Sequence, residues 1–137
     1  MMISTRGRYA LRVMIDLAEN SDGSYIPMKA VAERQEISLK YLERILPALV
    51  KAGFIEGMQG KSGGYKLTKE PQEYRVGDIL RLTEGDLAPV SCLECGAEPC
   101  GFSGQCRTKP VWDKLYTAIN DCLDSVTVAD LRVKDEQ

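Results

Sequence analysis

The amino-acid sequence predicts a mainly α-helical protein with one small β-hairpin. Along most of the chain, apolar residues recur every three or four positions, the period of a helix with one buried face. Only residues 54–58 and 64–67 partly alternate apolar and polar side chains, which indicates two short strands. Residues 92–106 hold four cysteines and show no apolar period, so we expect a loop there, neither helix nor strand.

Composition excludes several classes of function. The 137 residues are 44% apolar and 28% charged, as in an ordinary soluble protein with its own core. No apolar run reaches eighteen residues and charge interrupts the N-terminal stretch, so we expect a cytoplasmic protein with no membrane partner. The chain has no histidine, which removes histidine-based catalysis and histidine metal ligands. We expect neither an enzyme nor a small-molecule substrate.

Three helices are predicted in the first part of the chain. They cover residues 4–20, 28–34 and 38–52, and residues 25–26 can form a short strand before the second. The third helix continues past Pro47, where we expect a kink. Its predicted inward stripe consists of Leu42, Ile45, Leu46, Leu49 and Val50. A short helix, a tight turn and a second helix with one apolar face are typical of a helix-turn-helix, and a plain helical hairpin is the alternative.

The predicted β-hairpin favours the helix-turn-helix over a plain helical hairpin. Its two strands flank a polar, basic tip at residues 59–63 and follow the third helix directly, as a wing follows a recognition helix. Residues 1–70 carry eleven Lys or Arg against eight Asp or Glu, whereas residues 71–137 carry seven against twelve. Only the front half is therefore expected to face a polyanion such as DNA. The predicted fold is a winged helix-turn-helix domain plus a long C-terminal dimerisation helix.

The back half supplies that helix. After a short helix at residues 76–83, Pro110 begins a helix that extends to Asp124. Its broad apolar stripe predicts a dimer seam, and core packing within one chain is the alternative. Cys122 lies on the stripe and is expected to be buried. We divide the chain into a DNA-binding domain (1–86), a cysteine loop (87–110), the dimerisation helix (111–125) and a short terminal helix and tail (126–137), which begins at a capping box.

The cysteine loop is the candidate sensor. Cys92, Cys95, Cys100 and Cys106 are separated by two, four and five residues. Clustered thiols in a reducing compartment are more often metal ligands than disulfides, and thiolates suit iron–sulfur clusters and zinc. Structural zinc sites usually set two close pairs well apart, which lowers the zinc interpretation. Pairing into regulatory disulfides stays open.

Several blocks of the sequence resemble a known family. They are ISTRGRYALRVMIDLA, SLKYLERILPALVKAGFI, GGYKL, VGDILRLTEG and VWDKLYTAINDCLDSVTVADL. Together they resemble the winged-helix repressors that include the iron–sulfur cluster regulator IscR, the nitric-oxide sensor NsrR and the cysteine-metabolism repressor CymR, with IscR the suspected match. The resemblance implies a homodimer on a palindromic double-stranded DNA operator. It also implies a [2Fe-2S] cluster in the cysteine loop, which aerobic preparation can remove.

The resemblance also assigns cluster ligands. Cys100 and Cys106 match the family's second and third cysteines, and we favour Cys92 over Cys95 as the first. The sequence departs from the family pattern at Lys109, which stands where IscR has its histidine ligand. A protonated lysine cannot replace that ligand. The fourth ligand must come from elsewhere, and Cys95, a carboxylate or a residue of the partner subunit are the alternatives.

The resemblance also implies which residues contact DNA. Glu43 matches the recognition-helix acid that makes IscR's operator choice depend on its cluster, and Gln59 stands where IscR has a wing arginine, with Lys61 available to compensate. The candidate phosphate contacts are Arg6, Arg8 and Lys61; the remaining candidate DNA contacts are Ser38, Lys40, Tyr41, Glu43, Arg44, Gln59 and Tyr65.

The expected function is a regulator of transcription that senses cluster status and controls cluster-biogenesis genes. The alternatives are a thiol-redox or zinc-responsive repressor, and a CymR-like repressor of cysteine metabolism that acts through a protein partner.

Overall fold

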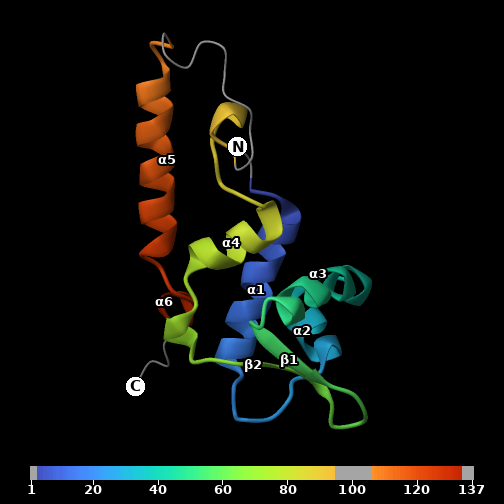
Figure 1. Cartoon of the computed structure of the whole chain (residues 1–137). Coiled ribbons are helices and arrows are strands. Elements are labelled where there is room, and N and C mark those ends of the chain that lie inside the picture. Colours follow the sequence, from blue (N-terminus) through green and yellow to red (C-terminus); the bar gives the residue numbers. More distant parts are fainter. Residues whose placement is uncertain (1–2, 95–105, 134–137) are drawn as a thin grey trace.

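The computed structural model describes residues 3–94 and 106–133 (Figure 1). Its elements are α1 (Thr5–Glu19), α2 (Met28–Gln35), α3 (Leu39–Lys51), β1 (Ile55–Met58), β2 (Gly64–Leu67), the 3₁₀ turn η1 (Pro71–Glu73), α4 (Val76–Glu84), the 3₁₀ turn η2 (Ser91–Leu93), α5 (Lys109–Asp124) and α6 (Val128–Leu131). The predicted fold class, mainly helical with a two-stranded wing, is confirmed. The expectation that the cysteine region lacks helix is wrong at one point, because Cys92 lies within the single turn η2.

Helix α1 is the centre of the fold. Figure 1 shows it in the middle of the molecule, and it contacts α2, α3, β2, α4 and α6. The core residues buried around it include Val13, Met14, Leu17, Val31, Leu42, Ile45, Leu49, Ile55, Ile79 and Val128. The predicted inward stripe of α3 is confirmed except at Val50, whose side chain is 42% exposed. Val50 lies beside a hollow between α3 and the wing, where no core residue covers it.

A buried carboxylate fixes the helix-turn-helix to α1. Asp16 is 2% exposed and accepts hydrogen bonds from both nitrogens of the Arg34 guanidinium fork, at 2.7 and 3.0 Å. Gln35 donates a third bond to it at 2.9 Å. Glu36 then adopts a left-handed conformation (φ 54°), which turns the chain from α2 into α3. Because a buried carboxylate must be paired, this contact sets where α2 ends against α1.

The wing is a two-stranded antiparallel hairpin, in which Ile55 pairs with Leu67 and Met58 with Gly64. The proposed strand at residues 25–26 is reduced to one bridge, between Ile26 and Tyr65. The tight approach of Gly64 to Ile26 leaves no room for a side chain there, so the hairpin lies directly against this segment.

Helix α5 stands along one side of the molecule (Figure 1). It begins at Lys109, one residue before the predicted start, and none of its residues is buried. Tyr116, Ile119 and Leu123 pack against the small cluster formed by Val76, Leu80 and Leu87, so this face is half-covered by the chain itself. Val111 and Leu115, on another face, are 57% and 42% exposed.

Cys122, for which the sequence predicts burial on the dimer stripe, is exposed in the single chain. It lies on the face of α5 that carries Leu115 and that nothing in the described part of the chain covers. Among the described residues, no helix is both long and apolar enough to cross a membrane.

Candidate nucleic-acid interface and cysteine site

Helix α3 presents a polar face to solvent. Ser38 caps it by accepting a hydrogen bond from the backbone N–H of Tyr41 at 3.1 Å, as the sequence predicts. Ser38, Lys40, Glu43 and Arg44 are all exposed, while the opposite face is anchored in the core. Tyr41 is half-buried, because its ring packs edge-on against Tyr9 of α1, with centroids 5.2 Å apart. The predicted contact residues of this helix therefore share one accessible surface.

The wing brings Tyr65 toward that surface. A hollow of about 410 Å³ lies between α3 and β2, and it is lined by Glu43, Leu46, Pro47, Val50, Lys51 and Tyr65. Glu43 and Tyr65, far apart in sequence, thus border one hollow. Gln59 and Lys61 are exposed beyond it, at the tip of the hairpin. Sequence reasoning missed Lys51 and Val50; their spacing of seven and eight residues from Glu43, two helical turns, was the available signal.

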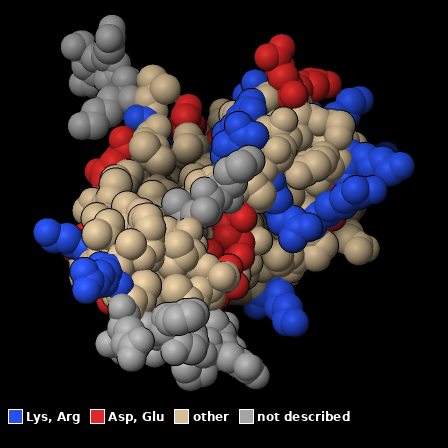
Figure 2. Space-filling model, turned by 90° about the horizontal axis from the view of Figure 1, so that it is seen from above, with Lys and Arg blue, Asp and Glu red and all other residues tan. Residues whose placement is uncertain are grey.

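The first turns of α1 carry the other predicted cations. Arg6 and Arg8 are exposed, and Arg8 donates to the Thr5 hydroxyl at 3.2 Å. Arg12 is engaged instead with the side-chain and backbone oxygens of Gln35. In Figure 2, more Lys and Arg side chains project on the side where α3 lies than on the side of α5. The basic surface is therefore concentrated over the winged domain.

Two cysteines of the loop fall within the described residues. Cys92 is exposed and Cys106 is half-buried, whereas Cys95 and Cys100 fall outside the described residues. Cys106 lies three residues before Lys109, the first residue of α5. The ion pair of Lys109 with Asp113 at 2.8 Å raises the pKa of Lys109, and the charges of Cys92 and Cys106 add to this effect.

The surroundings of Cys106 favour the thiolate form more than water does. Its sulfur lies 3.3 Å from the hydroxyl of Thr108, and this hydrogen bond, with the backbone N–H groups of Thr108 and Lys109, lowers the pKa of the thiol. Lys109 itself is paired with Asp113 and offers no ligand. Among the residues that the structure describes, no group of three or more Cys, Asp or Glu is placed to hold a metal ion. The donor chemistry nonetheless fits a thiolate-bound centre, because the metal-binding form of cysteine is the one favoured at Cys106.

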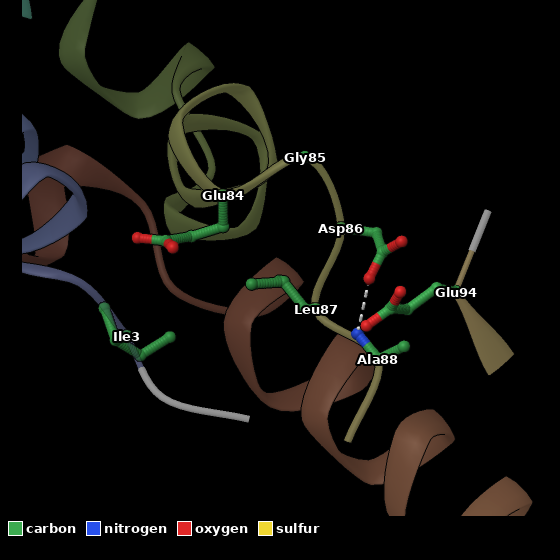
Figure 3. Close-up of a pocket in the computed structure, with 7 residues that line it drawn as sticks. All are labelled: Ile3, Glu84, Gly85, Asp86, Leu87, Ala88 and Glu94. Atoms are coloured by element: carbon green, nitrogen blue, oxygen red, sulfur yellow. Dashed lines mark hydrogen bonds between the residues drawn. The ribbon is translucent and has the colours of Figure 1, made fainter. Parts of the chain in front are cut away.

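A second hollow, of about 280 Å³, separates the start of the chain from the segment after α4 (Figure 3). It is lined by Ile3, Glu84, Gly85, Asp86, Leu87, Ala88 and Glu94. Figure 3 shows the Asp86 and Glu94 carboxylates near the backbone of Ala88, whereas the Glu84 carboxylate turns away from them, toward α1. No periodic signal in the sequence indicated this site, because it joins the N-terminus to a segment about eighty residues later.

Comparisons with known proteins agree with this architecture. Residues 3–134 match the family model Rrf2, described as iron-dependent transcriptional regulators. The chain is 33% identical over 136 residues to the regulator IscR of Aliivibrio salmonicida, covering 99% of this chain and 80% of that protein. It is 37% identical over 131 residues to the regulator CymR of Bacillus subtilis, covering 96% and 89%.

The similar solved structures likewise include both CymR and IscR proteins. The structure of CymR (YrzC), the global cysteine regulator of B. subtilis, superposes with a TM-score of 0.80 at 36% identity, covering 96% of this chain and 95% of that one. T. potens IscR superposes with a TM-score of 0.75, also at 36% identity, covering 96% and 85%. The winged helix-turn-helix fold with its exposed recognition helix agrees with these matches. The chain therefore belongs to the Rrf2 family of DNA-binding transcriptional regulators, and it is not an enzyme.

Proposed function

We propose that the protein is a homodimeric, cytoplasmic regulator whose DNA binding depends on a [2Fe-2S] cluster, and that it controls cluster-biogenesis genes. The observation that supports this proposal is the contact of the Cys106 sulfur with the Thr108 hydroxyl, 3.3 Å apart, immediately before the helix proposed for dimerisation. We assign Cys92, Cys100 and Cys106 as ligands, with Cys95 the candidate for the fourth. The likeness to IscR supports the same assignment.

The cluster would supply a redox-sensitive, thiolate-bound centre that ties distant parts of the cysteine segment together. This chain's residues do the rest. Thr108 hydrogen-bonds the sulfur of Cys106, and Lys109 adds a positive charge near that sulfur. Because α5 starts at Lys109, ordering the loop would fix the first turn of that helix. We propose the four-part division at residues 86/87, 110/111 and 125/126 on this basis.

On the DNA side, two roles follow from position. Ser38, Lys40, Tyr41, Glu43 and Arg44 would approach base edges in the major groove. Arg6, Arg8 and Lys61 would contact phosphates, while Gln59 and Tyr65 would lie at the wing. A dimer would place two such helices in successive major grooves of a palindrome.

The first experiment is metal analysis of protein purified without oxygen. We expect about two irons and two sulfides per chain and a visible absorption band. Single Ala variants at Cys92, Cys100 and Cys106 should lose them, whereas Cys122→Ala, outside the loop, should retain them. Full iron in Cys95→Ala would dismiss Cys95 as the fourth ligand. Stoichiometric zinc, or no metal after reconstitution, would overturn the cluster proposal.

A second experiment tests the DNA roles. A duplex selected from a random pool serves as the operator. Glu43→Ala should change the preferred bases by about tenfold in relative affinity, because a carboxylate accepts only from donor edges such as cytosine N4. Arg6→Ala should weaken all sequences alike and lower the salt dependence. If Glu43→Ala, like Arg6→Ala, changed the affinity for every sequence by the same factor, the assignment of Glu43 to base contact would be contradicted.

One alternative has a specific observation behind it. The superposition on CymR is at least as good as that on IscR, and CymR is described as a cysteine regulator. A CymR-like repressor that responds through a protein partner or through thiol oxidation would need no metal. If the triple variant Cys92→Ala, Cys100→Ala, Cys106→Ala keeps the operator choice of wild type, and any response of wild type to iron or oxidant is unaltered, a protein partner is favoured. A metal-free protein that loses its oxidant response in that variant would favour thiol oxidation.

A further inference from the structure

Glu84, the last residue of α4, binds the first turn of α1. Its Oε1 accepts hydrogen bonds from the backbone N–H of Ser4 at 3.0 Å and from the Ser4 hydroxyl at 2.5 Å. The same hydroxyl accepts a hydrogen bond from the backbone N–H of Gly7 at 3.2 Å. Ser4 therefore relays the Glu84 carboxylate to the N–H groups that open the helix. Figure 3 shows the side chain directed toward α1.

The start of α1, and not the end of α4, provides a favourable environment for the Glu84 carboxylate. A carboxylate at the C-terminus of a helix meets the negative end of the helix dipole, which is unfavourable. The N-terminus of α1 has the opposite need, because its first turn contains no acidic residue and Arg6 and Arg8 add positive charge there. Glu84 thus supplies the anion that the start of α1 lacks.

Close packing keeps this contact in register. A Cβ on the buried Gly7 would lie 2.4 Å from Oε1 of Glu84, so only glycine lets the carboxylate approach the helix this closely. The opposite end of α4 is also held, since the backbone N–H of Val76 donates to the carbonyl oxygen of Val126 at 2.9 Å. Glu84 is therefore presented to α1 from a helix that is fixed at both ends.

We propose that Glu84 is a positioning residue for DNA binding: through Ser4 it holds the first turn of α1 so that Arg6 and Arg8 face the DNA backbone. The inference rests on the proposed role of these two arginines as phosphate contacts. Glu84 also immediately precedes Gly85 (φ 86°) and the segment that leads to Cys92, so it lies where that segment leaves the winged domain.

The test measures binding of the full-length protein to a random-sequence duplex of about 30 base pairs, since phosphate contacts do not depend on sequence. Glu84→Ala should weaken binding about five- to tenfold and lower the salt slope by about one to two units. Simple charge predicts the reverse, because the variant removes a negative charge. Glu84→Gln keeps an oxygen acceptor for Ser4 and should stay within about twofold of wild type. Glu94→Ala, which removes a carboxylate from the same hollow without a bond to α1, is the matched control and should not weaken binding.

Hydrogen exchange separates positioning from general instability. In Glu84→Ala, the amides of Gly7 and Arg8 should exchange faster while those in the centre of α1 stay protected. Gly7→Ala should mimic Glu84→Ala, although alanine favours a helix more than glycine does. In the double variant the clash with the carboxylate is gone and only the milder approaches to Thr83 Oγ1 (3.1 Å) and Leu80 Cδ2 (3.2 Å) remain, so the combined loss should be clearly smaller than the sum of the two single losses.

The outcomes are distinguishable. Wild-type affinity in Arg6→Ala, Arg8→Ala would overturn the proposed phosphate contacts and, with them, this inference. Weak binding there but wild-type affinity and salt slope in Glu84→Ala would overturn the positioning role alone. A Glu84→Gln variant as weak as Glu84→Ala, or additive losses in the Gly7 and Glu84 double variant, would also overturn it.

Discussion

Arg81 is the principal polar link between α4 and α5. Its guanidinium binds both oxygens of Asp124 and the side-chain oxygen of Asn120, and it lies 3.4 Å from Asp78. Gly77 faces the same carboxylate so closely that a Cβ would lie 2.1 Å from Asp124 Oδ1. The Arg81 and Asp124 side chains are 30% and 29% exposed, so solvent screens the pair in part. The contact therefore fixes the angle of α5 more than it adds to stability.

Asp124 predicts a specific pH dependence. The hydrogen bonds from Arg81 lower the pKa of Asp124 below its usual 3.8. A depressed folded-state pKa means that the stabilisation is complete above pH 3.8 and is lost as pH falls through the lower folded value. Wild type should exceed Asp124→Asn by about 1 kcal/mol in free energy of unfolding at pH 7, and the gap should shrink progressively as the pH falls below 3.8 and through the lower folded pKa. Urea unfolding across this range measures it.

The control is the same substitution in an Arg81→Met background. Without the guanidinium, Asp124→Asn should change the free energy of unfolding little at any pH, because the carboxylate has lost the partner that distinguishes it from an amide. A gap in the wild-type background that does not shrink as the pH falls below 3.8 would contradict the assigned cause.

At the residue level, features that depend on neighbouring residues, such as helix caps, were predictable from the sequence, whereas the burial of individual side chains was not. The caps at Ser38 and Thr127 were found correctly, because a cap depends on a side chain and the N–H three residues later. The prediction for Val50 was wrong, because an apolar residue on a helix is buried only where another element covers it. The contact of Glu84 with Ser4 was invisible for the same reason, since it joins elements eighty positions apart.

Among the elements, the wing depends most on a single backbone approach. Gly64 has a φ of 146°, and a Cβ there would lie 2.1 Å from the carbonyl oxygen of Ile26, which is backbone and cannot move alone. Tyr65 next to it exchanges hydrogen bonds with Ile26, at 2.8 and 2.9 Å. The bridge and the glycine together attach the hairpin to the segment that enters α2.

We expect Gly64→Ala to lower the free energy of unfolding by about 3 kcal/mol, because it adds a backbone clash to an unfavourable φ. The matched variant is Gly53→Ala, where φ is 78° and an added Cβ would meet no heavy atom of the described residues within 4 Å. It should cost only about 1–2 kcal/mol, the penalty of the left-handed conformation alone. Equal losses in urea unfolding would show that the approach to Ile26 does not matter.

Helix boundaries were predictable to within one or two residues, because apolar period, caps and the glycine at position 53 are local signals. Helix α3 continues through Pro47, as the apolar stripe on both sides indicated. The segment at residues 25–26 was less predictable: it makes one bridge only, because α2 begins at Met28, directly after Pro27.

At the scale of the whole molecule, the unpaired face of α5 is the most informative feature. Val111, Leu115, Ala118 and Cys122 recur at helical spacing and are all exposed. A shallow apolar hollow of about 320 Å³ lies beside them, lined by Ile3, Ala118, Ile119, Cys122 and Leu123. Sequence alone predicted the stripe but not its division into a face toward α4 and a face toward solvent, because that division depends on the angle that Arg81 and Gly77 impose.

That face predicts the effect of a single charge. If α5 pairs with its counterpart in a second copy, Leu115→Glu would bury a carboxylate in an apolar seam, which costs several kcal/mol. The dimer dissociation constant should rise at least about 100-fold, equivalent to about 2.7 kcal/mol. Sedimentation velocity should then show a monomer at concentrations where wild type is dimeric. Thr117→Glu adds the same charge to an exposed polar position of the same helix and should leave the dimer intact. Operator affinity should fall with dimerisation in Leu115→Glu only, because one winged domain can occupy only one half-site. A Leu115→Glu protein that stays dimeric would place the subunit contact elsewhere on the molecule.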